Sequence, residues 1–153
     1  MKRWVDFLFQ FEWAFTGIYG PNSDLDRRLL WEELAGIRNW WSVPCCFGGD
    51  FNAVRFPSER FGSGPFSSAM VNFSDFISEH GLIDLPLEGC TFTWSNSREV
   101  ASCSRLDRFL LSSDWEEHFL NIRQRQTPKV AFRSLPNPFK RGKFSEGQSA
   151  IPF

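Results

Sequence analysis

The segment Gly48-Gly49-Asp50-Phe51-Asn52 combines residue types that could act on a phosphate group. Asp50 supplies a charged acceptor or general base, and Asn52 supplies an uncharged donor for a phosphate oxygen. In an extended segment, residues two positions apart lie on the same face. The two glycines would let backbone or substrate approach closely. The alternative is a tight turn that uses Gly, Asp and Asn for their backbone preferences.

The segment SRLDRFLL, residues 104–111, is a second candidate. In a strand, alternation would place Leu106 and Arg108 on one face, with Asp107 and Phe109 on the other. A carboxylate beside core aromatic rings is costly unless it is paired or hydrogen-bonded. One known use of a buried Asp is to orient a histidine. The alternative is an ordinary Arg–Asp pair on an edge strand.

Tyr19 is the only tyrosine of the chain, and it lies in GIYGPN, residues 17–22. At the end of a strand its hydroxyl could donate to a phosphate, with Asn22 in the turn that follows. The alternative is that the strand end simply places this hydroxyl at the surface.

Hydrophobic periodicity and turn residues predict the elements that would position these side chains. Leucines at helical spacing predict a helix over residues 24–40, capped by Ser23 or Asp24. The apolar run at residues 42–47 predicts a strand buried on both faces and ending at Gly48-Gly49. The remaining expectations are strands at 4–9, 13–19, 91–94 and 105–111, a short apolar segment at 82–85, and helices at 67–80 and 112–119.

Strands that alternate with helices indicate a layered α/β or α+β domain. From residue 123 onward the sequence carries four prolines and little periodicity. Such a segment buries little apolar surface, so we expect loop or disorder there. The predicted organisation is therefore a domain over residues 1–122, followed by an irregular or disordered tail over residues 123–153.

The composition restricts the function classes. The formal net charge of −1 does not favour a nucleic-acid binder, although carboxylates at a metal site can offset a basic rim. The four cysteines fit no zinc pattern, and adjacent Cys45 and Cys46 are expected in the core. No secretory signal and no apolar stretch of about 18 residues is present, which predicts an intracellular protein of the nucleus or cytoplasm with no membrane partner.

Several motifs in series resemble one family. They are FTGIYGPN, WWxxPxxFGGDFNAVRxxSER, DFISEHGLIDLPLEGCTFTWSN and SRLDRFLLSSDWEEHF. Together they are similar to the endonuclease/exonuclease/phosphatase superfamily, and within it to endonuclease domains of plant LINE-type, non-LTR retroelements. The resemblance covers about Trp13 to Asn121. It implies an α+β fold, a layered α/β sandwich of this superfamily, here truncated to its C-terminal part.

The resemblance also implies roles for individual residues. Tyr19 would contact the scissile phosphate, with Asn22 nearby. Asp50 would act on the attacking water, Asn52 would contact the phosphate, and Asp107 would orient a catalytic histidine. The reaction would be hydrolysis of a phosphodiester assisted by Mg²⁺, with DNA as the partner.

Phe92 and Trp94 match the aromatic strand that borders the DNA-binding face in the family. Two further motifs have no match: an early Gln-Glu motif whose Glu binds the metal, and a late Ser-Asp-His strand. After Arg123 the chain has no Asp and no His. We therefore identify no metal ligand, expect Mg²⁺ to lack its protein carboxylates, and expect the missing half to leave an apolar sheet face exposed.

The resulting hypothesis is a remnant of a metal-dependent phosphodiesterase or DNA endonuclease domain from a retroelement, catalytically impaired. One alternative is a non-catalytic module that binds nucleic acid or protein through its aromatic surface. Another is a phosphatase that acts on a small substrate or a lipid headgroup, since the superfamily includes such enzymes.

Overall fold

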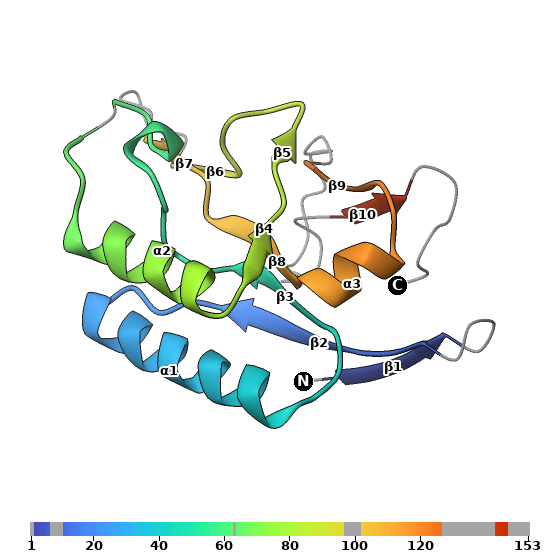
Figure 1. Ribbon diagram of the computed structural model, residues 1–153. Coiled ribbons are helices and arrows are strands. Elements are labelled where there is room, and N and C mark those ends of the chain that lie inside the picture. Colours follow the sequence, from blue (N-terminus) through green and yellow to red (C-terminus); the bar gives the residue numbers. More distant parts are fainter. Residues whose placement is uncertain (1, 7–10, 63, 97–101, 127–142, 147–153) are drawn as a thin grey trace, which may run out of the picture.

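A computed structural model describes residues 2–6, 11–62, 64–96, 102–126 and 143–146. A five-stranded sheet with the order β1-β2-β3-β8-β4 forms its centre (Figure 1). Its strands are β1 (Lys2–Asp6), β2 (Phe11–Tyr19), β3 (Cys45–Asp50), β8 (Asp107–Ser112) and β4 (Leu82–Asp84). Strands β2 and β3 are parallel, whereas the other neighbours are antiparallel. The expected α+β architecture is therefore present.

The parallel pair is joined by helix α1 (Asp24–Trp40), as the leucine spacing predicts. Its N-cap is Ser23, whose side chain accepts a hydrogen bond from the Asp26 amide at 3.2 Å. Helix α2 (Ser68–Glu79) begins in the same way, with Ser67 as its N-cap. Gly81 follows with φ of 57°, a conformation that favours glycine after a helix.

Helices α1 and α2 lie side by side on one face of the central sheet (Figure 1). There Trp31 of α1 stacks on Phe73 of α2 at 4.7 Å between ring centroids, and both pack near Phe47 of β3. The opposite face carries a second apolar cluster that includes Trp13, Phe109 and Trp115. Because β3 contributes Phe47 to one cluster and Cys46 to the other, it is buried on both faces.

The second cluster is covered by helix α3 (Ser113–His118), which contributes Trp115. Trp13, Phe109 and Trp115 are 5%, 8% and 1% exposed. The expectation of an exposed apolar sheet face is therefore wrong for these residues, because α3 and the segment after it pack against the sheet.

Smaller sheets surround the centre. Strands β10 (Lys143–Glu146), β9 (Ile122–Arg125) and β5 (Leu87–Glu88) form one, and β6 (Trp94–Ser95) with β7 (Cys103–Ser104) forms another. Strand β7 also forms an antiparallel bridge to Arg60, just after the short 3₁₀ helix Pro57–Glu59.

Three expectations need correction. The strand predicted at residues 42–47 begins at Cys45 and continues through both glycines to Asp50, because its pairing with β2 and β8 extends that far. The strand predicted at residues 91–94 is reduced to β6, whose partner β7 was not predicted. An irregular tail is contradicted at β9 and β10, which pair with each other; residues 127–142 and 147–153 lie outside the described residues.

Within the described part of the chain, no helix is long and apolar enough to cross a membrane.

Candidate functional site

Three of the predicted site residues lie in one row across the central sheet. Tyr19 of β2 is in register with Asp50 of β3, and Asp50 is in register with Asp107 of β8. Residues in register on neighbouring strands project to the same face of a sheet. The row therefore lies at the edge where β2 and β3 end and β8 begins, on the face that carries the second apolar cluster.

The two aspartates of this row are close neighbours. A hydrogen bond from the Phe51 amide to the Leu106 carbonyl, at 3.0 Å, flanks the pair of Asp50 and Asp107. This is the pattern of a non-hydrogen-bonded antiparallel pair, in which Cβ atoms are roughly 4.5–5.5 Å apart. Asp107 is 6% exposed, whereas Tyr19 is 83% exposed. The row thus runs from a buried carboxylate to a phenol in solvent.

Glycines allow the strand ends of the site to approach each other. The Gly20 amide donates to the Asp50 carbonyl at 2.6 Å, and a Cβ at Gly20 would lie 2.1 Å from the Phe51 carbonyl oxygen. Gly49 has φ of 141°, and a Cβ there would lie 2.2 Å from the Ile18 carbonyl oxygen. Gly49 therefore serves the close backbone approach that the sequence predicts, and Gly20 serves a second one that it does not predict.

Asn52 does not continue the strand, contrary to the expectation of an extended segment. Its φ of 49° is left-handed, which asparagine tolerates better than most residues. Its amide donates to Asp50 Oδ1 at 2.8 Å, and its side chain donates to Asn22 Oδ1 and, at 3.5 Å, to the Gly20 carbonyl. The segment is therefore a tight turn, and this turn brings the side chain of Asn52 to that of Asn22.

Arg27 in the first turn of α1 holds the two loops of the site together. Its Nη1 donates to the carbonyls of Asn22 at 2.9 Å, Asn52 at 3.0 Å and Pro21 at 3.1 Å. Asp24 accepts a hydrogen bond from the same guanidinium group. Sequence reasoning did not single out Arg27, because its role depends on the contact between two loops that are distant in the chain.

The aromatic segment with Phe92 and Trp94 is connected to the start of β8 through Thr93. The Thr93 hydroxyl oxygen accepts hydrogen bonds from the amides of Leu106 at 2.9 Å and Asp107 at 3.0 Å. Phe92 and Trp94 line an open hollow of about 290 Å³, together with Cys90, Thr91, Thr93, Ser95, Cys103 and Gln126. The predicted binding residues therefore adjoin the segment that carries Asp107.

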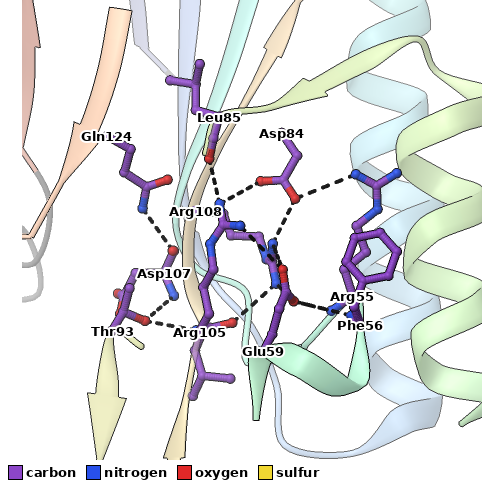
Figure 2. A network of polar contacts seen from close by, with 11 residues as sticks. Arg55, Phe56, Glu59, Asp84, Leu85, Thr93, Arg105, Asp107, Arg108 and Gln124 are labelled. Carbon is purple, nitrogen blue, oxygen red and sulfur yellow. Dashed lines mark hydrogen bonds and ion pairs between the residues drawn. The ribbon is translucent and has the colours of Figure 1, made fainter. Parts of the chain in front are cut away.

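Asp107 lies beside a buried ion-pair network that the sequence did not predict. Figure 2 shows the guanidinium groups of Arg105 and Arg108 directed toward Glu59 and Asp84. Arg108 is fully buried; it donates to Asp84 Oδ2 at 2.8 Å, to Glu59 Oε1 at 3.0 Å and also to Glu59 Oε2. The alternative of an Arg–Asp pair on an edge strand is contradicted, since β8 is internal and Arg108 pairs with Glu59 and Asp84 rather than with Asp107.

The network favours the ionised form of Glu59. Burial alone would raise the pKa of Glu59, but the hydrogen bonds and charge of Arg108, with the Arg55 amide and Arg105, hold it below its ordinary value. Burial, followed by the charge of Arg108, lowers the pKa of Arg105. Three arginines, with Arg55 at 3.7 Å from Asp84, face two carboxylates, so the cluster carries one excess positive charge.

Neither histidine of the chain lies near Asp107. His118 stacks on Phe11 at 3.6 Å, and Phe11 is separated from Tyr19 by the length of β2, about 26 Å at 3.3 Å per residue. His80 is the C-cap of α2, next to β4, where Leu82 pairs with Ser112 at the far end of β8. Both histidines therefore belong to the opposite end of the sheet.

The donor set of the site does not match the divalent metal that the resemblance implies. Among the described residues, no three His, Cys, Asp or Glu side chains gather to hold a metal ion. Asp50 and Asp107 supply carboxylates, but Mg²⁺ requires an octahedral set of oxygen ligands. Burial raises the pKa of Cys45 and Cys46, which keeps these core thiols protonated. The described residues therefore do not fit a Mg²⁺ site.

The arrangement supports recognition more directly than catalysis. A phenol, two amide side chains and two carboxylates surround the edge of the sheet, and they offer donors and acceptors suited to a phosphate and its water. The excess charge of the ion-pair network lies on the other face of β8, where Arg108 contacts Phe73 at 5.4 Å.

Comparisons with known proteins show the family of the chain and a similar fold. Residues 3–121 match the endonuclease/exonuclease/phosphatase family. Among solved structures, the fold is similar to the "Endonuclease domain of TRAS1, a telomere-specific non-LTR retrotransposon", with a TM-score of 0.54 and 18% identity. The match covers 74% of this chain and 50% of the TRAS1 chain. No curated protein matches the chain.

Proposed function

Since the chain belongs to the endonuclease/exonuclease/phosphatase family, we propose that its site recognises a phosphodiester of DNA and derives from a retroelement endonuclease. The alignment of Tyr19, Asp50 and Asp107 in one row carries the proposal. Three separate motifs of the sequence converge there on one edge of one sheet. One solved structure with a similar fold is a retrotransposon endonuclease domain, and this chain matches half of its length.

Each residue then has a defined contact. Tyr19, which is exposed at the rim, donates its hydroxyl to a phosphate oxygen. Asn52 and Asn22 give the amide donors, and the bond between them breaks when the phosphate binds. Asp50 accepts a proton or a hydrogen bond from the attacking water. Phe92 and Trp94 border the bound strand, and their rings can stack on bases.

The family is generally dependent on a divalent metal, and we propose that this chain by itself is catalytically impaired. Its two histidines lie at the other end of the sheet, so neither can take the position that Asp107 would orient. Loss of one member of a catalytic unit typically reduces the rate by several orders of magnitude.

Binding of DNA tests the recognition half of the proposal. Fluorescence anisotropy of a labelled oligonucleotide duplex should show affinity that falls as salt rises. Tyr19→Phe should weaken binding by roughly tenfold, the loss of one hydrogen bond to a charged group. Asp50→Asn should strengthen binding severalfold, because it removes a negative charge beside the phosphate.

Two exposed residues provide matched controls for these variants. Trp40→Phe changes an aromatic residue that is 88% exposed, and Asp75→Asn makes the same charge change on α2. Both control variants should bind the DNA duplex with the same affinity as the unmodified chain. Equal affinities for all four variants would exclude a phosphate contact at this row.

Cleavage tests the impairment. Incubation of supercoiled plasmid with the chain and Mg²⁺ should give no more nicked product than incubation with the Asp50→Ala variant. Nicking that Asp50→Ala abolishes would show a competent active site and overturn the proposed impairment.

A further inference from the structure

The geometry points to Arg108 and Glu59 as positioning residues: we propose that their buried ion pair fixes the register of β8 and thereby places Asp107 opposite Asp50. Nothing in the reaction or the proposed binding contacts uses these two side chains. The structural part of this inference stands on contacts alone; its consequence for DNA binding rests on the proposed function.

The ion-pair network joins three segments that are distant in the sequence. The Glu59 carboxylate accepts hydrogen bonds from the amides of Arg55 at 2.6 Å and Phe56 at 3.4 Å, which fixes the turn after the Asp50–Asn52 segment. The same carboxylate binds Arg108 in β8 and Arg105 just before it. Glu59 therefore ties the chain leaving β3 to the chain entering β8.

The end of β4 is the third segment. Arg105 Nη2 donates to Asp84 Oδ1 at 3.0 Å and to the Leu85 carbonyl at 2.5 Å. Arg108 reaches the other oxygen of Asp84 at 2.8 Å. Because β8 lies between β3 and β4, the network holds the start of β8 from both of its neighbours.

The alternation of β8 makes this pair a determinant of register. Arg108 and Leu110 face the helices α1 and α2, whereas Asp107 and Phe109 face the second apolar cluster. A shift of one residue would move every side chain of β8 to the other face. Arg108 would then enter an apolar cluster away from Glu59, and a buried charge without its partner is strongly unfavourable.

Apolar residues of β8 would penalise such a shift much less. Leu110 and Leu111 lie in the two clusters and are of the same type, so exchanging their faces changes little in hydrophobicity. The register information of this strand therefore resides mainly in its charged residues. Buried ionic groups that specify register are the best-attested use of such pairs.

The backbone of Asp107 is held on its other side as well. Its amide donates to the Thr93 hydroxyl at 3.0 Å, and its carbonyl accepts from Gln124 Nε2 at 3.0 Å (Figure 2). These bonds fix Asp107 only when β8 has the observed register. The ion pair and the backbone contacts thus select the same alignment.

Amide hydrogen exchange followed by NMR tests the inference in the full chain. Glu59→Gln should speed exchange at the amides of Phe51, Leu106 and Asp107 by roughly tenfold or more relative to the Leu34 amide of α1. The matched control is Glu88→Gln, which makes the same change at a carboxylate that also pairs with two arginines, Arg123 and Arg125, but at the surface. The control should leave the ratio unchanged.

A milder variant covers the case in which Glu59→Gln does not fold. Arg105→Gln removes one side of the network and leaves the pair of Arg108 and Glu59 in place. It should raise the same exchange ratio by a smaller factor. If all amides, including that of Leu34, speed up equally in the folded variants, the network is only a source of global stability and the positioning role is wrong.

Affinity provides the second measurement. At a temperature where Glu59→Gln is fully folded, its DNA affinity should fall by roughly the tenfold expected for Tyr19→Phe. Unchanged affinity in a variant with the altered exchange ratio would remove the link between register and binding. If the unmodified chain binds no DNA, the proposed function fails, and the exchange ratio alone decides the positioning role.

Discussion

At the scale of single residues, the close contact between the backbones of Gly20 and the Asp50–Phe51 segment leaves no room for a side chain at position 20. Gly20 lies between Tyr19 and the turn with Asn22, and its amide binds the Asp50 carbonyl. A side chain there would meet backbone atoms, which cannot move aside as a flexible side chain can. The residues that bear the chemistry are thus positioned by a neighbour that has no side chain.

Gly20→Ala should destabilise the fold by about 1–3 kcal/mol, because a Cβ 2.1 Å from the Phe51 carbonyl oxygen forces the two strand ends apart. Gly36→Ala is the control, since an added Cβ there has no atom within 4 Å in an exposed position of α1. It should stabilise by about 0.5–1 kcal/mol. Urea denaturation measures both, and equal stability of Gly20→Ala and the unmodified chain would contradict the contact.

At the scale of elements, charged residues connect segments that local sequence signals leave independent. Glu59 belongs to the 3₁₀ helix after β3, Asp84 ends β4, and Arg108 lies in β8. Each of them is unremarkable alone in the sequence, and their pairing becomes visible only when the sheet order is known. Because the network holds the pKa of Glu59 below its ordinary value, the free energy of unfolding depends on pH.

Stability should fall in acid through Glu59. Its folded pKa lies below its ordinary value, so its contribution is complete above about pH 4.3 and is lost as the pH falls through the folded value. Denaturation midpoints measured from pH 7 to pH 3 should decline mainly below pH 4.3. Glu59→Gln, which itself costs about 3–5 kcal/mol, should show a flatter decline, and Glu88→Gln should follow the unmodified chain. A decline of the same slope in Glu59→Gln would contradict this assignment.

At the scale of the whole molecule, two apolar clusters enclose the central sheet. The helices α1 and α2 cover one face, and α3 covers the other (Figure 1). Trp115 of α3 packs edge-on against Trp13 at 5.6 Å. A short helix and aromatic residues therefore cover the face of the sheet opposite α1 and α2.

Trp115→Ala should therefore cost about 3–5 kcal/mol, because it opens a cavity in the second cluster. Trp40→Ala, at a position that is 88% exposed, should change stability by no more than about 0.5 kcal/mol. Thermal and urea unfolding measure both variants. A small effect of Trp115→Ala would mean that the second cluster contributes little, and that α3 only rests on the sheet.

Local signals determined much of this protein from the sequence. The leucine spacing and Ser23 predict α1, Ser67 and Gly81 bound α2, and the predicted alternation places Arg108 and Phe109 on opposite faces of β8, as the structure does. These features depend on residues a few positions apart, which is the range over which capping and periodicity act.

Tertiary structure alone decided the register. That Tyr19, Asp50 and Asp107 form one row depends on the pairing of three strands, and strand pairing joins residues that are far apart in the chain. For the same reason the sequence showed neither the bond between Asn52 and Asn22 nor the partners of Arg108. Spacing within one segment fixes which face a side chain takes, while contacts between segments fix what it meets there.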